Sequence, residues 1–201
     1  MSSTLITVLV VLLVVGAVLV VLGVVANRRR ALRQRFGPEY DRVVESTEDR
    51  RTAERELRDR ERRHAELELR PLDPASRERY SASWEEIQVR FVDAPDQAVG
   101  EADDLVTRLV AERGYPTGDY DDQLAHLSVE HARTLDHYRQ AHDINERNAR
   151  GEATTEQLRQ ALVHYRALFA DLLGTEPEHL ASTATNPANN RSDGPDRERQ
   201  P

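Results

Sequence analysis

The chain has 201 residues without cysteine or lysine, and its 28 basic residues, all arginine, are outnumbered by 36 acids. The missing cysteines exclude disulfides, thiolate catalysis and cysteine-ligated metal sites. The missing lysines exclude Schiff-base chemistry and the phosphate-binding P-loop. Residues 36–201 hold 23 arginines and all 36 acids, a net charge of −13, which argues against nucleic acid as a partner.

The N-terminal segment, residues 1–26, is predicted to be a transmembrane anchor. Residues 4–26 carry no charge and are almost all Val, Leu, Ile, Ala and Gly. A helix of this length reaches about 35 Å, enough to cross the ~30 Å hydrocarbon layer of a bilayer. A cleavable signal peptide is the alternative, but it would need a basic start and a shorter apolar run.

A basic collar, residues 27–38, follows the anchor and is predicted to lie at the membrane interface. Its five arginines are Arg28, Arg29, Arg30, Arg33 and Arg35. By the positive-inside rule these arginines predict that the N-terminus lies outside and the body lies in the cytoplasm. The predicted location is the cell (inner) membrane, so the lipid bilayer is one expected partner. Gly37 and Pro38 predict a bend. Gly16 and Gly23 share a helix face and leave room for a weak homo-oligomer, although their spacing is not the four-residue pairing motif.

Residues 39–70 are predicted to form one long, charged juxtamembrane helix that acts as a solvated stalk. Three favourable i,i+4 ion pairs support the helix, namely Glu54–Arg58, Glu56–Arg60 and Asp59–Arg63. The stalk is as highly charged as a coiled coil, but it has no sustained heptad repeat of apolar residues, so a strong coiled coil is not predicted. A weak partner helix is the alternative interpretation.

Residues 71–174 are predicted to form an antiparallel four-helix bundle, which makes the protein all-α. The apolar spacing predicts helices over about 74–91, 95–113, 121–149 and 155–173. Their ends are marked by Asp73 with Pro74, by Gly114, by a Thr154–Gln157 capping box and by Gly174. The tail, residues 175–201, is rich in Pro, Asn, Ser and Thr and is predicted to be disordered.

Four short stretches together resemble one protein family. They are RFGPEYDR at 35–42, ERGYP at 112–116, HARTLDHYR at 131–139 and ALVHYR at 161–166. They are similar to a family of uncharacterised actinobacterial single-pass helical proteins, often described only as membrane or secreted proteins. The resemblance covers about residues 28–174 and implies no activity, ligand or catalytic residue. A secreted location would conflict with the topology that the arginines predict.

The histidines are the first candidates for metal chemistry, since six of the seven lie beyond residue 120. Only His126 and Glu130 could chelate a metal from adjacent helical turns, and they lack the spacing of a known zinc motif. We therefore expect no metal and no cofactor. His131 and His142 lie in the apolar stripe of their helix and are interpreted as buried neutral histidines, with pH sensing as the alternative.

The acidic loop at 114–122 is the candidate contact surface for a protein partner. The predicted contact residues are Tyr115, Asp119, Tyr120, Asp121 and Asp122, because aromatic and acidic side chains in a turn could anchor a basic partner. The alternative is that both tyrosines close the end of the bundle.

No catalytic set is expected, because Ser128 and His131 lie one turn apart without the strand–turn–helix elbow of a nucleophilic serine. The predicted function is a non-enzymatic, membrane-anchored adaptor or scaffold that presents a helical bundle to a protein partner. The alternative is a metal- or small-ligand-binding helical sensor, and a membrane-linked enzyme comes third.

Overall fold

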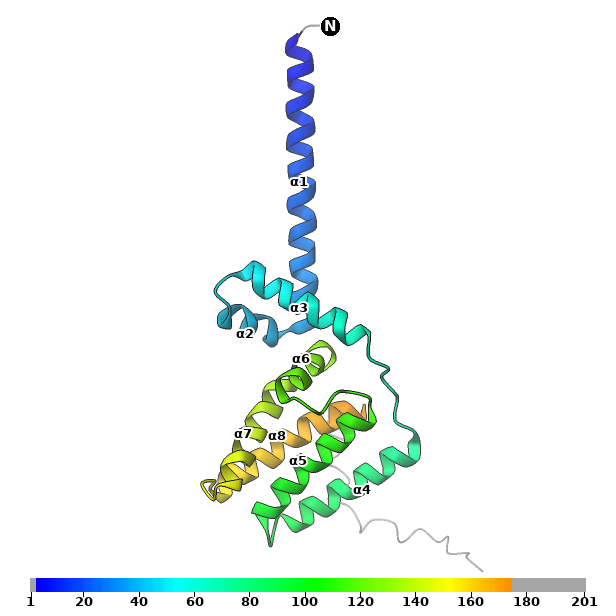
Figure 1. Ribbon diagram of the computed structural model, residues 1–201, viewed down its shortest axis with the longest axis vertical. Coiled ribbons are helices and arrows are strands. Elements are labelled where there is room, and N and C mark those ends of the chain that lie inside the picture. Colours follow the sequence, from blue (N-terminus) through cyan, green and yellow to red (C-terminus); the bar gives the residue numbers. More distant parts are fainter. Residues whose placement is uncertain (1–2, 175–201) are drawn as a thin grey trace, which may run out of the picture.

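The computed structural model describes residues 3–174, and all regular structure in this range is helical, which confirms the all-α class. The helices are α1 (Ser3–Phe36), α2 (Pro38–Ser46), α3 (Arg50–Ala65), α4 (Pro74–Arg90), α5 (Pro95–Glu112), α6 (Tyr120–Glu130), α7 (Leu135–Ala149) and α8 (Thr155–Leu173) (Figure 1). The predicted disordered tail, 175–201, lies outside the described residues.

Helix α1 projects alone from the rest of the molecule (Figure 1). It is the one helix in the described range that is long and apolar enough to cross a membrane. The arginine collar continues the same helix down to Phe36. There Gly37 adopts a positive φ of 47° and Pro38 starts α2, which confirms the predicted bend.

The prediction of a single helix over 39–70 is wrong, because the chain breaks it into α2 and α3 and leaves residues 66–73 non-helical. Asp49 begins α3 by accepting a hydrogen bond from the Thr52 backbone N–H at 3.2 Å. Helix α3 then folds back against α1 and α6. The segment is therefore no solvated stalk.

A first, small core explains why α3 folds back. It consists of Leu32, Phe36, Tyr40, Val43, Ala53, Leu57 and Val129, and we call it the juxtamembrane core. These side chains come from α1, α2, α3 and α6, so burying them ties the foot of α1 to three other helices. Phe36 and Leu57 are completely buried.

The predicted ion pairs along α3 are present in part. Glu54 pairs with Arg58 at 3.6 Å and Glu56 with Arg60 at 3.1 Å. The third prediction, Asp59–Arg63, is wrong because Arg63 instead reaches Asp122 of α6 at 3.1 Å and Asp59 pairs with Arg62. A packed neighbour thus competes with local helix partners.

The second core, which we call the main core, lies among α4, α5, α7 and α8, which pack together away from α1 (Figure 1). Its largest fully buried side chains include Trp84, Tyr138, Tyr165, Phe169, Leu109 and Leu135. Trp84 stacks on Phe169 with ring centroids 4.9 Å apart.

The predicted helix ends in this part of the chain are confirmed. The Asp73 side chain accepts from the Ser76 N–H at 2.9 Å, and Thr154 and Gln157 form the reciprocal capping box. Gly114 and Gly174 take positive φ angles of 93° and 72° after α5 and α8, as C-terminal glycines commonly do.

The prediction of one helix over 121–149 is also wrong. The chain forms α6 and α7, separated by a turn at residues 131–134. The Thr134 hydroxyl, which donates to the His131 carbonyl at 3.1 Å, stabilises this turn. Helix α6 contributes Leu124 and Leu127 to the main core and Val129 to the juxtamembrane core, and it packs against α1 and α3, so it joins the two cores.

Candidate functional site at the junction of the two cores

A chain of polar contacts crosses the junction between the cores. His131 Nδ1 lies 2.9 Å from Asp171 Oδ2, and its Nε2 lies 3.2 Å from the Tyr115 hydroxyl. The same hydroxyl lies 3.1 Å from Glu130 Oε2, whose other oxygen lies 3.3 Å from His64 Nε2. We call these five residues the junction chain. It connects α8, the turn at 131–134, the loop after α5, α6 and α3.

Burial and hydrogen bonds shift the pKa values of Tyr115, Glu130 and Asp171 in the junction chain. Burial raises the pKa of Tyr115 well above its ordinary value, so the phenol stays neutral. Burial acts to raise the pKa of Glu130, but hydrogen bonds from His64 and Tyr115 outweigh it and lower that pKa. The pKa of Asp171 is lowered in the same way, against burial, by His131 and Thr134. The ionised carboxylates of Glu130 and Asp171 therefore act as the hydrogen-bond acceptors that hold the junction chain together.

The structure places Tyr115 inside the molecule, with 4% of its surface exposed. This is incompatible with its predicted role as a surface contact for a partner. The alternative, that the tyrosine closes the end of the helical body, fits its position. Its raised pKa also makes the phenolate too scarce at neutral pH to act as a nucleophile.

The metal candidates His126 and Glu130 do not form a ligand pair. The Glu130 carboxylate is held by His64 and Tyr115, while the nearest carboxylate to His126 Nε2 is that of Asp122, at 3.8 Å. Among residues 3–174, no group of three or more His, Asp or Glu side chains is arranged to hold a metal ion.

Two buried ring nitrogens stand out beside the junction chain. Within the described part of the molecule, the Nδ1 atoms of His64 and His126 have no hydrogen-bond partner. The two rings lie side by side, with centroids 6.2 Å apart. Burial lowers the pKa of His126. A neutral imidazole with a free nitrogen can accept or donate one hydrogen bond or ligate a metal.

His131 and His142 differ in their surroundings. His131 is buried, as expected, but it belongs to the junction chain. His142 is only partly buried, and its Nδ1 lies 3.3 Å from Asp103 Oδ1. The hydrogen bond to Asp103 raises the pKa of His142 against the opposing effect of burial, so the interpretation as a neutral core histidine does not fit this residue.

A buried ion cluster forms the second polar link across the junction. Glu39 of α2, which is 3% exposed, accepts hydrogen bonds from Arg139 of α7 at 2.7 and 2.8 Å and from Arg60 of α3 at 3.1 Å. A cleft of about 270 Å³ opens beside it between α2, α3, α6 and α7. That volume is below the roughly 300–1,000 Å³ of a typical ligand pocket.

The arginine collar divides into paired and unpaired members. Arg29 contacts Glu54 at 3.1 Å, Arg33 contacts Asp41 at 2.7 Å and Arg35 contacts Glu61 at 3.5 Å. Arg28 and Arg30 form no ion pair with any described residue. A role of the collar at the membrane interface stays a prediction, and three of its five arginines also hold α2 and α3 against α1.

The remaining predicted contact residues lie at the start of α6, where Asp119 is the N-cap and the other three form the first turn. Tyr120 stacks on His142 with centroids 4.3 Å apart and is half-buried. Asp122 pairs with Arg63 at 3.1 Å. Asp119 caps α6, and both Asp119 and Asp121 are exposed, which leaves these two carboxylates as the accessible part of the predicted contact.

Comparison of the chain with protein-family models, curated proteins and solved structures finds no match. The resemblance to actinobacterial membrane proteins therefore stays a prediction, and the function is argued from the geometry of this chain. Sequence reasoning missed His64, Asp171 and Glu39 as parts of the junction, because their partners lie 21 to 100 residues away in the chain.

Proposed function

We propose that the protein is a single-pass, membrane-anchored adaptor that holds a protein partner close to the cytoplasmic face of the cell membrane. In this proposal α1 crosses the bilayer with its N-terminus outside, because the arginines follow the apolar segment rather than precede it. Helices α4, α5, α7 and α8 act as an antiparallel bundle and present the binding surface.

The observation that carries the proposal is the continuity of the anchor with the body. The collar part of α1 contributes Leu32 and Phe36, which are 5% and 0% exposed, to the juxtamembrane core. Buried contacts of this kind hold the body in a defined position below the membrane, whereas a flexible linker would leave its position open. A scaffold needs such a fixed position.

A non-enzymatic role agrees with the chemistry of the junction. The polar groups of the junction chain bond mainly to one another, and the cleft beside the junction is small. A catalytic site needs an accessible cavity in which substrate meets the reacting groups.

The accessible carboxylates Asp119 and Asp121 are the proposed contact for a basic segment of the partner. The test is co-purification from detergent-solubilised membranes with the full chain and with the variant D119N/D121N. Deleting the loop would be a poor test, because it would also remove Tyr115 and Asp122, which contact the rest of the fold.

The matched control for this test is E85Q/E86Q, which neutralises two exposed acids on α4 that form no ion pair within residues 3–174. A stoichiometric partner that is lost with D119N/D121N and kept with E85Q/E86Q supports the adaptor and its contact. Recovery of all three proteins alone from gently solubilised membranes contradicts the adaptor proposal.

Topology has a separate test. A reporter fused to the C-terminus is expected to be active only in a form that requires the cytoplasm. Activity only in a form that requires export would contradict the proposed orientation and change the pool of partners.

A small-ligand or metal sensor is the second candidate, and the unpartnered Nδ1 atoms of His64 and His126 favour it. If these nitrogens bind a metal, Zn²⁺ titration raises the melting temperature of the full chain, and His126→Ala removes the increase. A melting temperature that Zn²⁺ leaves unchanged removes the metal version of this candidate.

A further inference from the structure

The exposed side of α3 carries a row of four arginines. Arg51, Arg55, Arg58 and Arg62 follow one another at spacings of four, three and four residues, and all four are exposed. At about 100° per residue they fall within an arc of roughly 60° on the helix surface. We call these four residues the arginine face.

The arginine face points away from the body. Ala53, Leu57 and His64 are buried on the opposite side of α3, roughly 150° around the helix, where it packs on the juxtamembrane core and on α6. Glu54 and Glu61 lie between the two sides and hold the collar of α1. The arginine face is thus directed toward the side on which α1 extends.

When α1 spans the membrane as proposed above, α3 lies next to the bilayer surface, and this step rests on that proposal. The contacts of α3 with α1 begin at Arg29, three residues beyond the apolar segment that ends at Ala26. Three residues of helix span about 5 Å, which is similar to the headgroup layer of one leaflet. Because α3 runs across the foot of α1 (Figure 1), its length lies along the membrane surface.

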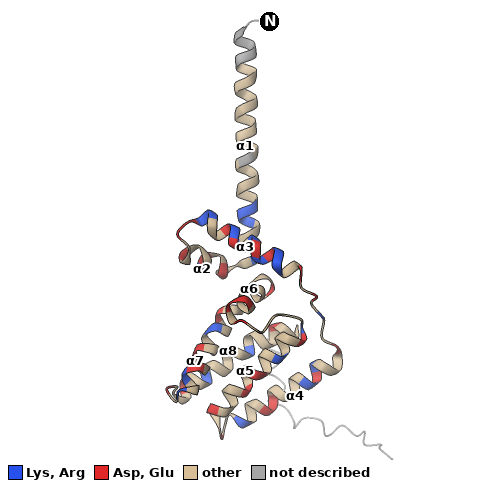
Figure 2. Ribbon diagram, in the orientation of Figure 1, with Lys and Arg blue, Asp and Glu red and all other residues tan. Residues whose placement is uncertain are grey.

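The charge distribution matches this position. Residues 27–65 hold 13 arginines against 9 acids, a net charge of +4, while residues 66–201 have a net charge of −12. Figure 2 shows basic residues at the foot of α1, basic and acidic residues mixed along α3, and both kinds again on the helices below. An anionic membrane surface therefore attracts the α3 side and repels the rest of the chain.

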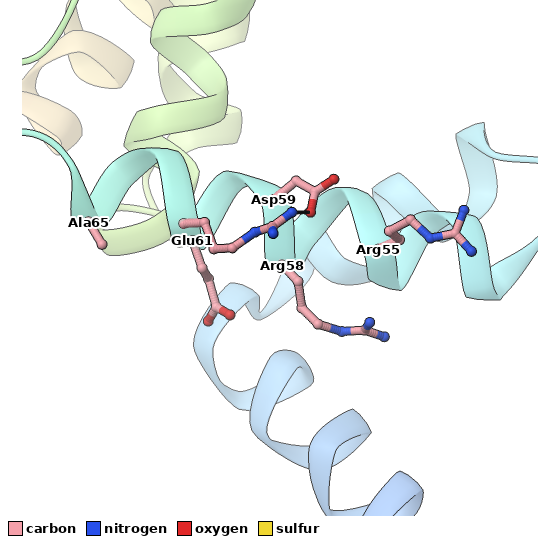
Figure 3. A pocket seen from close by; sticks show the side chains of 6 residues that line it. Arg55, Arg58, Asp59, Glu61 and Ala65 are labelled. Carbon is pink, nitrogen blue, oxygen red and sulfur yellow. Dashed lines mark hydrogen bonds and ion pairs between the residues drawn. The ribbon is translucent and has the colours of Figure 1, made fainter.

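The arginine face also has a shallow hollow. It has a volume of about 510 Å³ and is lined by Arg55, Arg58, Asp59, Glu61, Arg62 and Ala65. In Figure 3, Arg58 projects from α3 toward the side of α1. Guanidinium groups bind phosphate oxygens through two parallel hydrogen bonds. The three arginines of this hollow outnumber its two carboxylates, which makes it suitable for phospholipid headgroups.

We propose that the arginine face of α3 binds the anionic headgroups of the leaflet from which α1 emerges. Helix α3 is then an interfacial helix and the second membrane contact of the protein, next to the transmembrane anchor. The two contacts together fix both the distance and the orientation of the body relative to the bilayer. Basic clusters of about four to eight residues beside a transmembrane helix bind anionic lipid in this way.

The test uses the full chain in lipid nanodiscs made of phosphatidylcholine alone or of phosphatidylcholine with phosphatidylglycerol. Since the chain has no cysteine, Ala65→Cys gives one attachment site for a nitroxide label. Ala65 is exposed and lines the hollow at the end of the arginine face. We expect the accessibility of the label to a water-soluble relaxation reagent to fall severalfold when phosphatidylglycerol is present. High salt should reverse the effect, because it screens exposed charges.

Three variants in the Ala65→Cys background separate the arginine face from general charge. They are R51Q/R55Q, R51Q/R55Q/R58Q/R62Q and the control R77Q/R108Q. The first removes exposed arginines that form no ion pair in the described structure, and the control does the same on α4 and α5. We expect the first variant to weaken the protection by phosphatidylglycerol, the second to abolish it and the control to keep it.

The outcomes distinguish this inference from the proposed anchoring. A flotation assay with vesicles of the same two lipid compositions tests the anchoring itself. Protein that floats with both kinds of vesicle but shows equal label accessibility in both kinds of nanodisc overturns the headgroup contact and leaves the anchor in place. An equal loss of protection in R77Q/R108Q also overturns it. Protein that floats with neither vesicle overturns the anchoring proposal, and the headgroup contact falls with it.

Discussion

Glu39 shows how much a single residue contributes to the junction. Its carboxylate is almost fully enclosed, and its charge is balanced by Arg60 and Arg139 from two other helices. An enclosed charge of this kind is stable only with both partners present. The residue therefore selects one arrangement of α2, α3 and α7 over others.

We expect Glu39→Gln to lower the free energy of unfolding by about 3 kcal/mol, since removing one member of a buried ion pair leaves the others uncompensated. Chemical denaturation of the full chain in detergent, followed by circular dichroism, measures the change. Glu45→Gln, on the exposed side of the same helix, should change it by less than about 0.5 kcal/mol. Equal effects of both substitutions would contradict the assigned role of Glu39.

Two histidines should give opposite pH dependences of stability. The pKa of His142 is raised by Asp103, so its stabilising contribution is complete below its unfolded pKa of 6.5 and is lost as pH rises through the folded pKa. The pKa of His126 is lowered by burial, so stability is lost as pH falls below 6.5 through its folded pKa.

The corresponding measurement compares melting temperatures of the full chain at about pH 5.5 and about pH 8.5. His142→Asn should cost more stability at the lower pH, because only there does the wild type gain from the charged imidazole. His126→Asn should make the loss of stability on acidification less steep. Parallel pH profiles for the wild type and both variants would refute the assigned protonation effects.

At the scale of the helices, local signals in the sequence predicted the ends well. Gly37, Asp73 and Thr154 act through neighbours within four residues, so their effect can be read from the sequence. The turn between α6 and α7 carries no glycine or proline. It depends on contacts of His131 with Tyr115 and of Thr134 with Asp171, which only the folded chain brings together.

The contrast between local signals and contacts formed only in the folded chain also explains which parts of the candidate site could be predicted. The arginine collar was predicted from its composition, but its pairs with Glu54 and Glu61 depend on α3 folding back onto α1. The i,i+4 rule assigned Glu54 only to Arg58. Tyr115 was predicted as a surface residue because loops are usually exposed, whereas its ring is buried against the ring of His64 from α3, with centroids 5.9 Å apart.

Gly114 is the helix-end glycine with the strictest requirement for its residue type. It has a φ of 93°, and a Cβ atom would lie 2.7 Å from the carbonyl oxygen of Glu68. We expect Gly114→Ala to lower the melting temperature, at a cost of about 1–3 kcal/mol for the strained backbone and the clash. Gly100→Ala in α5, where the added Cβ meets nothing within 4 Å, should stabilise by about 0.5–1 kcal/mol. The same sign for both substitutions would contradict this explanation.

For the whole molecule, the arrangement of the two cores has functional consequences. The juxtamembrane core includes the foot of α1, while the main core lies among α4, α5, α7 and α8. Polar contacts join them, namely the junction chain and the Glu39 cluster. Polar links are more sensitive to pH and ionic strength than apolar packing, so the junction responds to solution conditions more readily than either core.

Two phenylalanines allow the cores to be disrupted one at a time. Phe36 is completely buried in the juxtamembrane core and Phe169 in the main core. Replacing a buried phenylalanine with alanine typically costs about 3–5 kcal/mol. If the cores are separate cooperative units, each substitution destabilises mainly the helices around its own core.

Hydrogen–deuterium exchange of the full chain in nanodiscs measures this separation. Phe36→Ala should increase exchange in α2, α3 and α6 and leave α4, α5 and α8 close to wild type. Phe169→Ala should show the reverse pattern. An equal increase across all helices for either variant would mean that the anchor foot and the body unfold as one unit. Neither core could then open without the other, so the polar junction would not separate two independently unfolding units.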